Sequence, residues 1–191
     1  MKDKVFNIVI NPNGASGTAK TIFKKIEPLL IKNNIKYIVH TSSISEGISS
    51  ICSRLTKLNE DIYLVLIGGD GSLNEAVNGI VNFEKTYVGF IPCGSGNDFA
   101  RSINLPQKLD ELVSIIFKGE VKRTCDIGEV TMHNFSEEFR KLPDVKDNQF
   151  KRKFNVSTGI GFDAEICQKT HVTQVKPFLN KIRLGKLSYL F

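Results

Sequence analysis

Residues 62–72 read Ile-Tyr-Leu-Val-Leu-Ile-Gly-Gly-Asp-Gly-Ser and decide the fold class. The run Ile62–Ile67 is continuously apolar or aromatic and rich in β-prone residues, which is typical of a strand buried on both faces. The run stops at two glycines, and a helical pattern from Ser72 to about Val81 follows. The stretch therefore predicts a strand, a glycine turn and a helix, the repeating unit of an α/β protein.

The same alternation extends in both directions along the chain. Apolar runs predict further strands at Lys4–Ile10, Ile35–His40 and Tyr87–Ile91. Apolar residues at helical spacing predict helices at Thr18–Asn33 (with Thr18 or Ser16 as its N-cap), Ser45–Leu58, Asp98–Ile103 and Lys108–Phe117. Because continuous apolar strands alternate with helices, we expect a parallel sheet that helices cover on both faces.

The pattern changes near residue 120. Val121–Thr131 and Lys151–Thr158 have the alternating character of strands, and a polar stretch separates them, so an antiparallel hairpin is predicted. Phe162–His171 and Pro177–Phe191 are the candidate helices that follow. We therefore expect an α/β domain at residues 1–124 and the incomplete start of a β-rich second domain at residues 125–191.

Composition narrows the class of protein. Of the 191 residues, 41% are hydrophobic and 24% are charged, which is typical of a folded globular protein and excludes intrinsic disorder for most of the length. The four cysteines (Cys52, Cys93, Cys125 and Cys167) are too far apart for a metal or redox pair and are expected to be reduced thiols. No apolar run approaches the roughly 18 residues of a membrane span, and Met1–Ile10 indicates a strand rather than a secretory signal. We expect a cytoplasmic protein whose net charge of +6 favours anionic partners.

Glycine loops follow three of the predicted strands and open helices. They are Asn11-Pro-Asn-Gly-Ala-Ser-Gly17, Gly68-Gly-Asp-Gly-Ser72 and Gly94-Ser-Gly-Asn-Asp98. Because the carboxyl ends of parallel strands meet at one edge of a sheet, the three loops converge there. Backbone N–H groups at helix N-termini attract phosphate, and glycine lets phosphate oxygens approach the backbone closely. The loops together predict a phosphate-binding edge.

Acidic residues stand inside these loops. Asp70 lies between glycines, where a plain turn needs no carboxylate, and Mg²⁺ between it and a phosphate would explain it. Simpler alternatives stay open at this point. Each loop can be an ordinary strand-to-helix turn, Glu75 a charge that complements the helix dipole, and Asp98 a helix cap.

Several motifs resemble those of the diacylglycerol kinase catalytic-domain family, which includes bacterial lipid kinases, sphingosine kinases and ceramide kinases. The matching segments are Asn11-Pro-x-Gly14, Gly68-Gly-Asp-Gly-Ser-x-Asn-Glu75, Pro92-x-Gly-Ser-Gly-Asn-Asp-Phe-Ala-Arg101, Asp126-Ile-Gly128 and Phe154-Asn-Val-Ser-Thr-Gly-Ile-Gly-Phe-Asp-Ala164. They cover nearly the whole chain in the family's order. The Gly-Gly-Asp-Gly motif also resembles NAD kinases and phosphofructokinases, whereas the segment ending at Arg101 selects the lipid kinases.

The resemblance implies a two-lobed kinase that transfers the γ-phosphoryl group of ATP to a lipid hydroxyl such as that of diacylglycerol, with Mg²⁺. The nucleotide-binding positions that it implies are Asn11, Pro12, Asn13, Gly14, Thr41, Gly68, Gly69, Asp70, Gly71, Ser72, Asn74, Glu75, Gly94, Ser95, Gly96 and Asn97. Ser72 and Ser95 replace a commoner threonine, and Thr41 matches by its place in the order alone. Asp70, Asp98 and Asp126 form the implied catalytic set.

The resemblance also implies about a hundred further residues, which would carry structural metal ligands and a glutamate base. We therefore expect this chain to be a shortened lipid kinase that binds nucleotide weakly, turns over little lipid and self-associates. Its lipid substrate would place it at the inner membrane face, and no nucleic-acid partner is expected. The rival hypothesis is a non-catalytic nucleotide-binding or regulatory module with a kinase-like fold.

Overall fold

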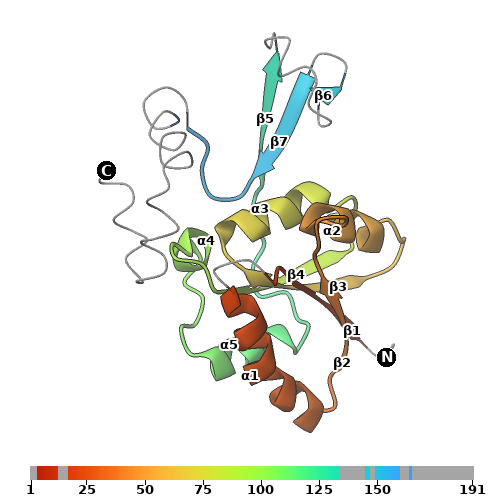
Figure 1. The fold of residues 1–191 in the computed structure, drawn as a ribbon, viewed down its shortest axis with the longest axis vertical. Coiled ribbons are helices and arrows are strands. Elements are labelled where there is room, and N and C mark those ends of the chain that lie inside the picture. Colours follow the sequence, from red (N-terminus) through yellow and green to blue (C-terminus); the bar gives the residue numbers. More distant parts are fainter. Residues whose placement is uncertain (1–3, 13–16, 134–144, 147–148, 160–163, 165–191) are drawn as a thin grey trace.

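The computed structural model describes residues 4–12, 17–133, 145–146, 149–159 and 164 (Figure 1). Within these ranges the elements follow one another as strands and helices in alternation, and then as strands alone. In chain order they are β1 (Val5–Ile10), α1 (Thr18–Lys32), β2 (Lys36–Thr41), α2 (Ile48–Thr56), β3 (Ile62–Gly68), α3 (Asp70–Gly79), β4 (Thr86–Pro92), α4 (Asp98–Ser102), α5 (Leu109–Ile116), β5 (Gly128–His133), β6 (Val145–Lys146) and β7 (Gln149–Phe154).

The first four strands form one parallel sheet in the order β2-β1-β3-β4. Strand β3 lies inside the sheet and is buried along its length except at Tyr63, which is half-buried. Strand β2 is an edge strand without a fully buried residue. The continuous apolar run of residues 62–67 therefore belongs to an interior strand, as the sequence predicts, and the parallel sheet is confirmed.

Helices cover both faces of this sheet, which confirms the predicted fold class. Successive β3 side chains alternate between two cores: Val65 and Ile67 enter one, and Leu64 and Leu66 enter the other. Helices α1 and α5 close the first core with Ala19, Ile26, Leu30, Leu112 and Val113, while α2, α3 and α4 close the second with Ile48, Ile51, Cys52, Leu73, Ala76 and Ala100. Figure 1 shows the two groups of helices on opposite sides of the sheet.

Helix boundaries differ from the predicted ones where local turns compete with the helix. Helix α2 begins at Ile48 rather than Ser45, because the N–H of Glu46 donates to the Ser43 Oγ at 3.1 Å and closes a turn before it. Helix α1 begins as predicted, yet Thr18 is not its cap. Gly17 takes that position with a φ of 84°, in the left-handed region that suits glycine, and no side chain caps the helix. Ser16 lies outside the described residues.

A second sheet, antiparallel, follows the first. Strand β5 pairs with β7, and β6 pairs with the other edge of β7. Gly128 lies opposite Phe154, and a Cβ on this glycine would be 2.2 Å from the Phe154 Cζ, so the ring covers the glycine backbone. The predicted hairpin is confirmed, but the prediction that its first strand begins at Val121 is wrong. Residues 121–127 are exposed and pair with no strand in the part of the chain that the structure describes. The candidate helices Phe162–His171 and Pro177–Phe191 lie outside the described residues except for Ala164.

The described cysteines are free thiols, as predicted, with Cys52 buried, Cys93 half-buried and Cys125 exposed. Cys167 lies outside the described residues. Among the helices that the structure describes, none combines the length and the apolar character needed to cross a membrane.

Helices α2 and α3 pack closely because the last residue of α3 is a glycine. A Cβ on Gly79 would lie 2.2 Å from the Ser49 carbonyl oxygen and 2.7 Å from the Ser49 Cα, so two helix backbones would have to separate. We expect Gly79→Ala to lower the free energy of unfolding by about 1–3 kcal/mol through overpacking. Urea unfolding measures this. Gly47→Ala is the matched control, since no atom lies within 4 Å of the added methyl group, and an equal loss in both variants would contradict the close-packing argument.

Candidate functional site

Three loops lie at the carboxyl ends of adjacent parallel strands. Strand β1 ends at Ile10 and leads into half-buried Asn11 and Pro12. Strand β3 leads into α3, and β4 leads into α4. Because β1, β3 and β4 are neighbours in the sheet, the three loops meet at one edge, as the sequence predicts. Asn13 and Gly14 lie outside the described residues.

The loops after β3 and β4 touch through glycines. A Cβ on Gly94 would lie 2.8 Å from the Gly69 Cα, and a Cβ on Gly69 would lie 3.1 Å from the Gly94 Cα. The N–H of Cys93 donates to the Gly68 carbonyl oxygen at 2.8 Å and extends the pairing of the two strands by one step. Two backbones therefore run side by side at this point with no room for side chains between them.

The carboxylate of Asp70 joins these loops. Its Oδ2 accepts the N–H of Asp98 and its Oδ1 accepts the N–H of Phe99, both at 3.1 Å. These are the first-turn donors of α4, which no side chain of its own N-cap satisfies. The N-cap, Asn97, has a φ of 53° and accepts the N–H of Gly94 through its Oδ1 at 2.8 Å. Asp70 thus caps the helix after the neighbouring strand, a role that the sequence analysis did not foresee.

Helix α3 has an open N-terminus. Its N-cap, Gly69, is extended and has no side chain, and no other side chain caps the helix. The first intrahelical bond runs from the Leu73 N–H to the Gly69 carbonyl oxygen at 3.0 Å, so the N–H groups of Gly71 and Ser72 have no hydrogen-bond partner within the described residues. Apart from the backbone of α3 itself and the two chain neighbours, no atom of the described residues lies within 4 Å of the place where a Cβ of Gly71 would stand. N–H donors with a partial positive charge therefore lack a partner at this helix end, beside a position with room for a ligand, and this suits an anion.

Two of the three predicted catalytic carboxylates, those of Asp70 and Asp98, lie close to each other. The Oδ2 atoms of Asp70 and Asp98 both flank Gly96, at 3.3 and 3.2 Å from the place of its absent Cβ. Asp98 also pairs with Arg101. Asp126 is exposed in the stretch before β5. Residues 4–12, 17–133, 145–146, 149–159 and 164 contain no set of three acidic, histidine or cysteine side chains that could hold a metal ion.

That arrangement still fits Mg²⁺ in the manner usual for kinases, in which one or two carboxylates act together with water and substrate phosphates. Asp70 and Asp98 are the two side chains that would take part. Glycine at position 96 keeps the space between them clear of a side chain.

Other predicted site residues have different surroundings. The side-chain N–H of Asn74 donates to the Lys153 carbonyl oxygen at 3.0 Å, so this amide joins α3 to β7 rather than facing the loops. Glu75 is exposed on α3, and Ser95 is exposed on the loop before α4. Thr41 is exposed on the edge strand β2, in register with Ile10 at the end of β1.

Asn78 and Lys153, which join α3 to β7, are not among the site residues that the sequence predicts. The Asn78 side chain accepts the Lys153 N–H through Oδ1 and donates to the Lys153 carbonyl oxygen through Nδ2, both at 2.9 Å. With Asn74 one turn earlier, it forms a pair of amides on one face of α3 that holds the strand backbone. The spacing of the two asparagines was the one available signal, and it cannot name a partner 75 residues away.

Thiol chemistry at the loops is disfavoured by burial. Cys93 lies between Pro92 and Gly94, and burial raises the pKa of its thiol to about 11. Burial, with a smaller contribution from Glu75, raises the pKa of Cys52 to about 12. Both thiols are therefore protonated at neutral pH and are poor nucleophiles.

A family model and the named relatives of this chain point to the same family. The family model described as the diacylglycerol kinase catalytic domain matches residues 6–130. The chain is 28% identical to YtlR of Bacillus subtilis, a protein named as a candidate lipid kinase, over 95% of this chain and 55% of that protein. It is 33% identical to the diacylglycerol kinase of Staphylococcus carnosus over 67% of this chain and 42% of that enzyme. The chain thus spans about half the length of these relatives.

Solved structures include a diacylglycerol kinase from Bacillus anthracis str. Sterne. It aligns with a TM-score of 0.48 and 24% identity, and the alignment covers 69% of this chain and 46% of that one.

The Asp70 carboxylate should stabilise the start of α4. Asp70→Ala leaves the N–H groups of Asp98 and Phe99 without their acceptors and is expected to lower the free energy of unfolding by about 0.5–2 kcal/mol, as for other lost helix caps. We also expect the Phe99 amide to exchange its hydrogen faster in Asp70→Ala than in the natural chain, which would place the loss of stability at the start of α4. Asp110→Ala is the control, because Asp110 is a first-turn carboxylate of α5 that makes no hydrogen bond within the described residues. Unchanged exchange at Phe99 would refute the capping role.

Proposed function

The chain belongs to the diacylglycerol kinase catalytic-domain family, and we propose that it carries the nucleotide-binding part of an ATP-dependent lipid kinase. One observation carries this proposal: the N-terminus of α3, which no side chain caps, lies in the first of two glycine loops whose backbones touch. The domain division follows the same reasoning, with residues 1–124 as the nucleotide-binding domain and residues 125–191 as the start of the second.

In this proposal the backbone does most of the phosphate binding. The N–H groups of Gly71 and Ser72 would donate to phosphate oxygens, with the Ser72 hydroxyl beside them. Gly68, Gly69, Gly94 and Gly96 keep the approach free of side chains, and Ser95 and Asn97 border it. Asn11, Pro12, Asn13, Gly14 and Thr41 would form the side of the site next to β1 and β2. Asn74 and Glu75 would support α3 from its first turns.

Bound ATP would supply the transferred phosphoryl group, and Mg²⁺ would neutralise its charge. In the transfer, a bond forms between the acceptor hydroxyl oxygen and the γ-phosphorus, the bond to the ADP oxygen breaks, and the hydroxyl proton leaves to a base. Asp70 holds the N-terminus of α4 through both of its oxygens, so it would position Asp98 and would also take part with Asp98 in holding Mg²⁺. Asp98 and Asp126 are exposed, and Asp98 pairs with Arg101 of its own helix. In this proposal these two carboxylates face the acceptor.

The acceptor in this proposal is a lipid hydroxyl, such as that of diacylglycerol, presented at the cytoplasmic face of a membrane. The names of the relatives support the class of acceptor. Lys151, Arg152 and Lys153 follow one another on β7 and give the second sheet a basic strand, which suits an anionic membrane surface.

A transfer assay separates the kinase from the non-catalytic module. The chain is incubated with γ-³²P-labelled ATP, Mg²⁺ and diacylglycerol in mixed micelles, and labelled lipid is extracted. We expect a low level of label above the no-protein background, which falls to that background in Asp98→Asn because the carboxylate that would face the acceptor is lost. Nucleotide binding without any lipid labelling would favour the non-catalytic module.

Nucleotide binding can be separated from folding at Gly71. Gly71→Ala places a methyl group in the open space at the α3 N-terminus and should leave the unliganded chain as stable or up to about 1 kcal/mol more stable, because alanine favours a helix. Mg²⁺-ADP at about 100 times its Kd should stabilise the natural chain by about 2.7 kcal/mol. We expect a much smaller shift in Gly71→Ala, measured by thermal unfolding. Gly47→Ala should keep the full shift, and an equal shift in all three chains would place the nucleotide elsewhere.

A further inference from the structure

A pocket of about 900 Å³ opens at the opposite end of α3 from the glycine loops. One wall is the outer face of α2, another is the C-terminal end of α3 with the segment after it, and β7 supplies a single residue. The lining residues are Ser49, Ser50, Ser53, Arg54, Lys57, Asn78, Gly79, Ile80, Val81, Phe83 and Lys153. Gly79 is nine residues beyond Asp70 on the same helix, a separation of about 14 Å at 1.5 Å per residue. The pocket is therefore separate from the nucleotide edge.

The charge of this pocket has one sign. Arg54, Lys57 and Lys153 line it, and no aspartate or glutamate does. Arg54 Nε makes an ion pair with Glu46 at 3.0 Å, and the Arg54 side chain stays about half exposed. Lys57 makes no ion pair within the described residues. With Arg54 paired to Glu46, Lys57 and Lys153 give the pocket an excess of positive charge that no ion pair among the described residues neutralises.

Serine hydroxyls accompany the cations. Ser49, Ser50 and Ser53 lie on the same face of α2, at the spacing of successive turns. None of the three hydroxyls makes a hydrogen bond within the part of the chain that the structure describes. Hydroxyl donors beside cations, with no acidic side chain among them, form the donor set that phosphate oxygens require.

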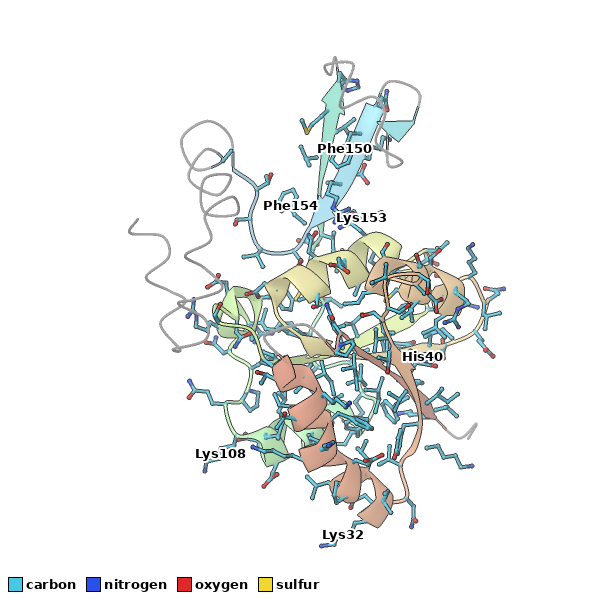
Figure 2. All side chains as sticks on the ribbon, in the orientation of Figure 1. Lys32, His40, Lys108, Phe150, Lys153 and Phe154 are labelled. Atoms are coloured by element: carbon cyan, nitrogen blue, oxygen red, sulfur yellow. The ribbon has the colours of Figure 1, made fainter. Side chains whose placement is uncertain are left out.

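Lys153 is held in place by its backbone. Asn78 binds both the N–H and the carbonyl oxygen of Lys153, and Asn74 binds the same carbonyl oxygen. The Lys153 Nζ lies 5.7 Å from the centre of the Phe83 ring, within range of a cation–π contact. Figure 2 shows Lys153 at the base of β7, where the strand meets α3. The second sheet therefore contributes a positioned cation, not a mobile surface lysine.

The helix dipole accounts for only part of this charge. Arg54 and Lys57 lie at the C-terminal end of α2, where cations are favourable in any helix. Lys153 comes from another sheet, so the dipole of α2 does not explain its presence. The opposite wall is apolar and open to solvent, with Val81 57% exposed and Phe83 38% exposed. A ligand with an anionic group beside an apolar part would therefore be complementary to both walls of the pocket: the anionic group to the cations and the apolar part to Val81 and Phe83.

We infer that this pocket binds a phosphate-bearing ligand, whose anionic group contacts Lys57, Lys153 and the α2 serines. The phosphate can belong to a lipid headgroup, with its apolar part against Val81 and Phe83, or to a free anion. This site is additional to the nucleotide site. It shares Lys153 with the basic strand that the proposed function places at a membrane, whereas Lys57 and the α2 serines belong to the pocket alone.

Two measurements on the whole chain test the inference. The first is thermal unfolding in inorganic phosphate against sodium chloride at the same ionic strength. The second is sedimentation with phosphatidylcholine vesicles that contain or lack phosphatidic acid. Both use the natural chain, Lys57→Gln, Lys153→Gln and Lys32→Gln. Lys32 ends α1 as Lys57 ends α2, so Lys32→Gln is matched in net charge and in its place at a helix C-terminus.

For a lipid headgroup we expect binding to the phosphatidic acid vesicles that falls about fivefold in Lys57→Gln and in Lys153→Gln, the effect of about one lysine near an anionic surface. Lys32→Gln should bind like the natural chain. For a free anion we expect a phosphate-dependent rise in Tm that both pocket variants reduce and Lys32→Gln keeps.

Equal losses in all three variants would mean that net charge alone drives binding, and this would overturn the inference. So would the absence of any binding to phosphate or to either vesicle. Gly71→Ala is measured in inorganic phosphate as well. A phosphate response that Gly71→Ala removes and the pocket variants keep would place the phosphate at the α3 N-terminus and would also overturn the inference. Each variant is also titrated with Mg²⁺-ADP, so a failure of the nucleotide site is seen separately.

Discussion

Strand β3 has to bury both of its faces, and the arrangement of the α/β part follows from that requirement. Leu64, Val65, Leu66 and Ile67 point alternately to two cores, and each core needs its own helices to exclude water. An interior parallel strand must also leave the sheet at its carboxyl end and pass to a helix on one face. Both β3 and its neighbour β4 make that exit at the same edge. The loops are crowded there, and glycines at positions 69 and 94 let the two backbones touch.

The sequence predicts the parts of this arrangement that local chemistry determines. The run Ile62–Ile67 matches β3 to within one residue, since an apolar β-prone segment between turn residues has few alternatives. Boundaries that depend on a partner are predicted less well. Val121–Ile127 alternates like a strand, yet none of the described strands pairs with it and it stays exposed. The antiparallel ladder starts at Gly128, where Phe154 lies opposite and covers the glycine. A pattern in one segment cannot show whether a second segment reaches it.

In the candidate site, too, features set by local sequence can be predicted and features that depend on a distant partner cannot. The convergence of the glycine loops follows from parallel strands and could be predicted, whereas the partners of Asp70 and Asn78 lie on elements 28 and 75 residues away. A turn that stands alone needs no carboxylate at position 70, whereas a turn that packs against the start of α4 uses that carboxylate as a helix cap. The carboxylate has a structural partner in the N–H groups of α4, so its presence does not by itself require a metal ion. Asp70 is therefore better understood as the group that orders the second glycine loop, and with it the carboxylate of Asp98.

Helix α3 links the chemistry at its two ends. Its N-terminus offers backbone donors and needs no cationic side chain to attract phosphate, because the aligned peptide dipoles supply the positive charge. Its C-terminal end attracts no anion by itself, since the dipole there is negative. The positive charge at that end comes from α2 and from Lys153, which Asn74 and Asn78 hold against the helix. These asparagines make the placement of Lys153 depend on the same helix that presents Gly71 and Ser72. A basic group at the far end of α3 is thus held by the hydrogen bonds between α3 and β7. That is the physical reason for treating the pocket as a binding surface.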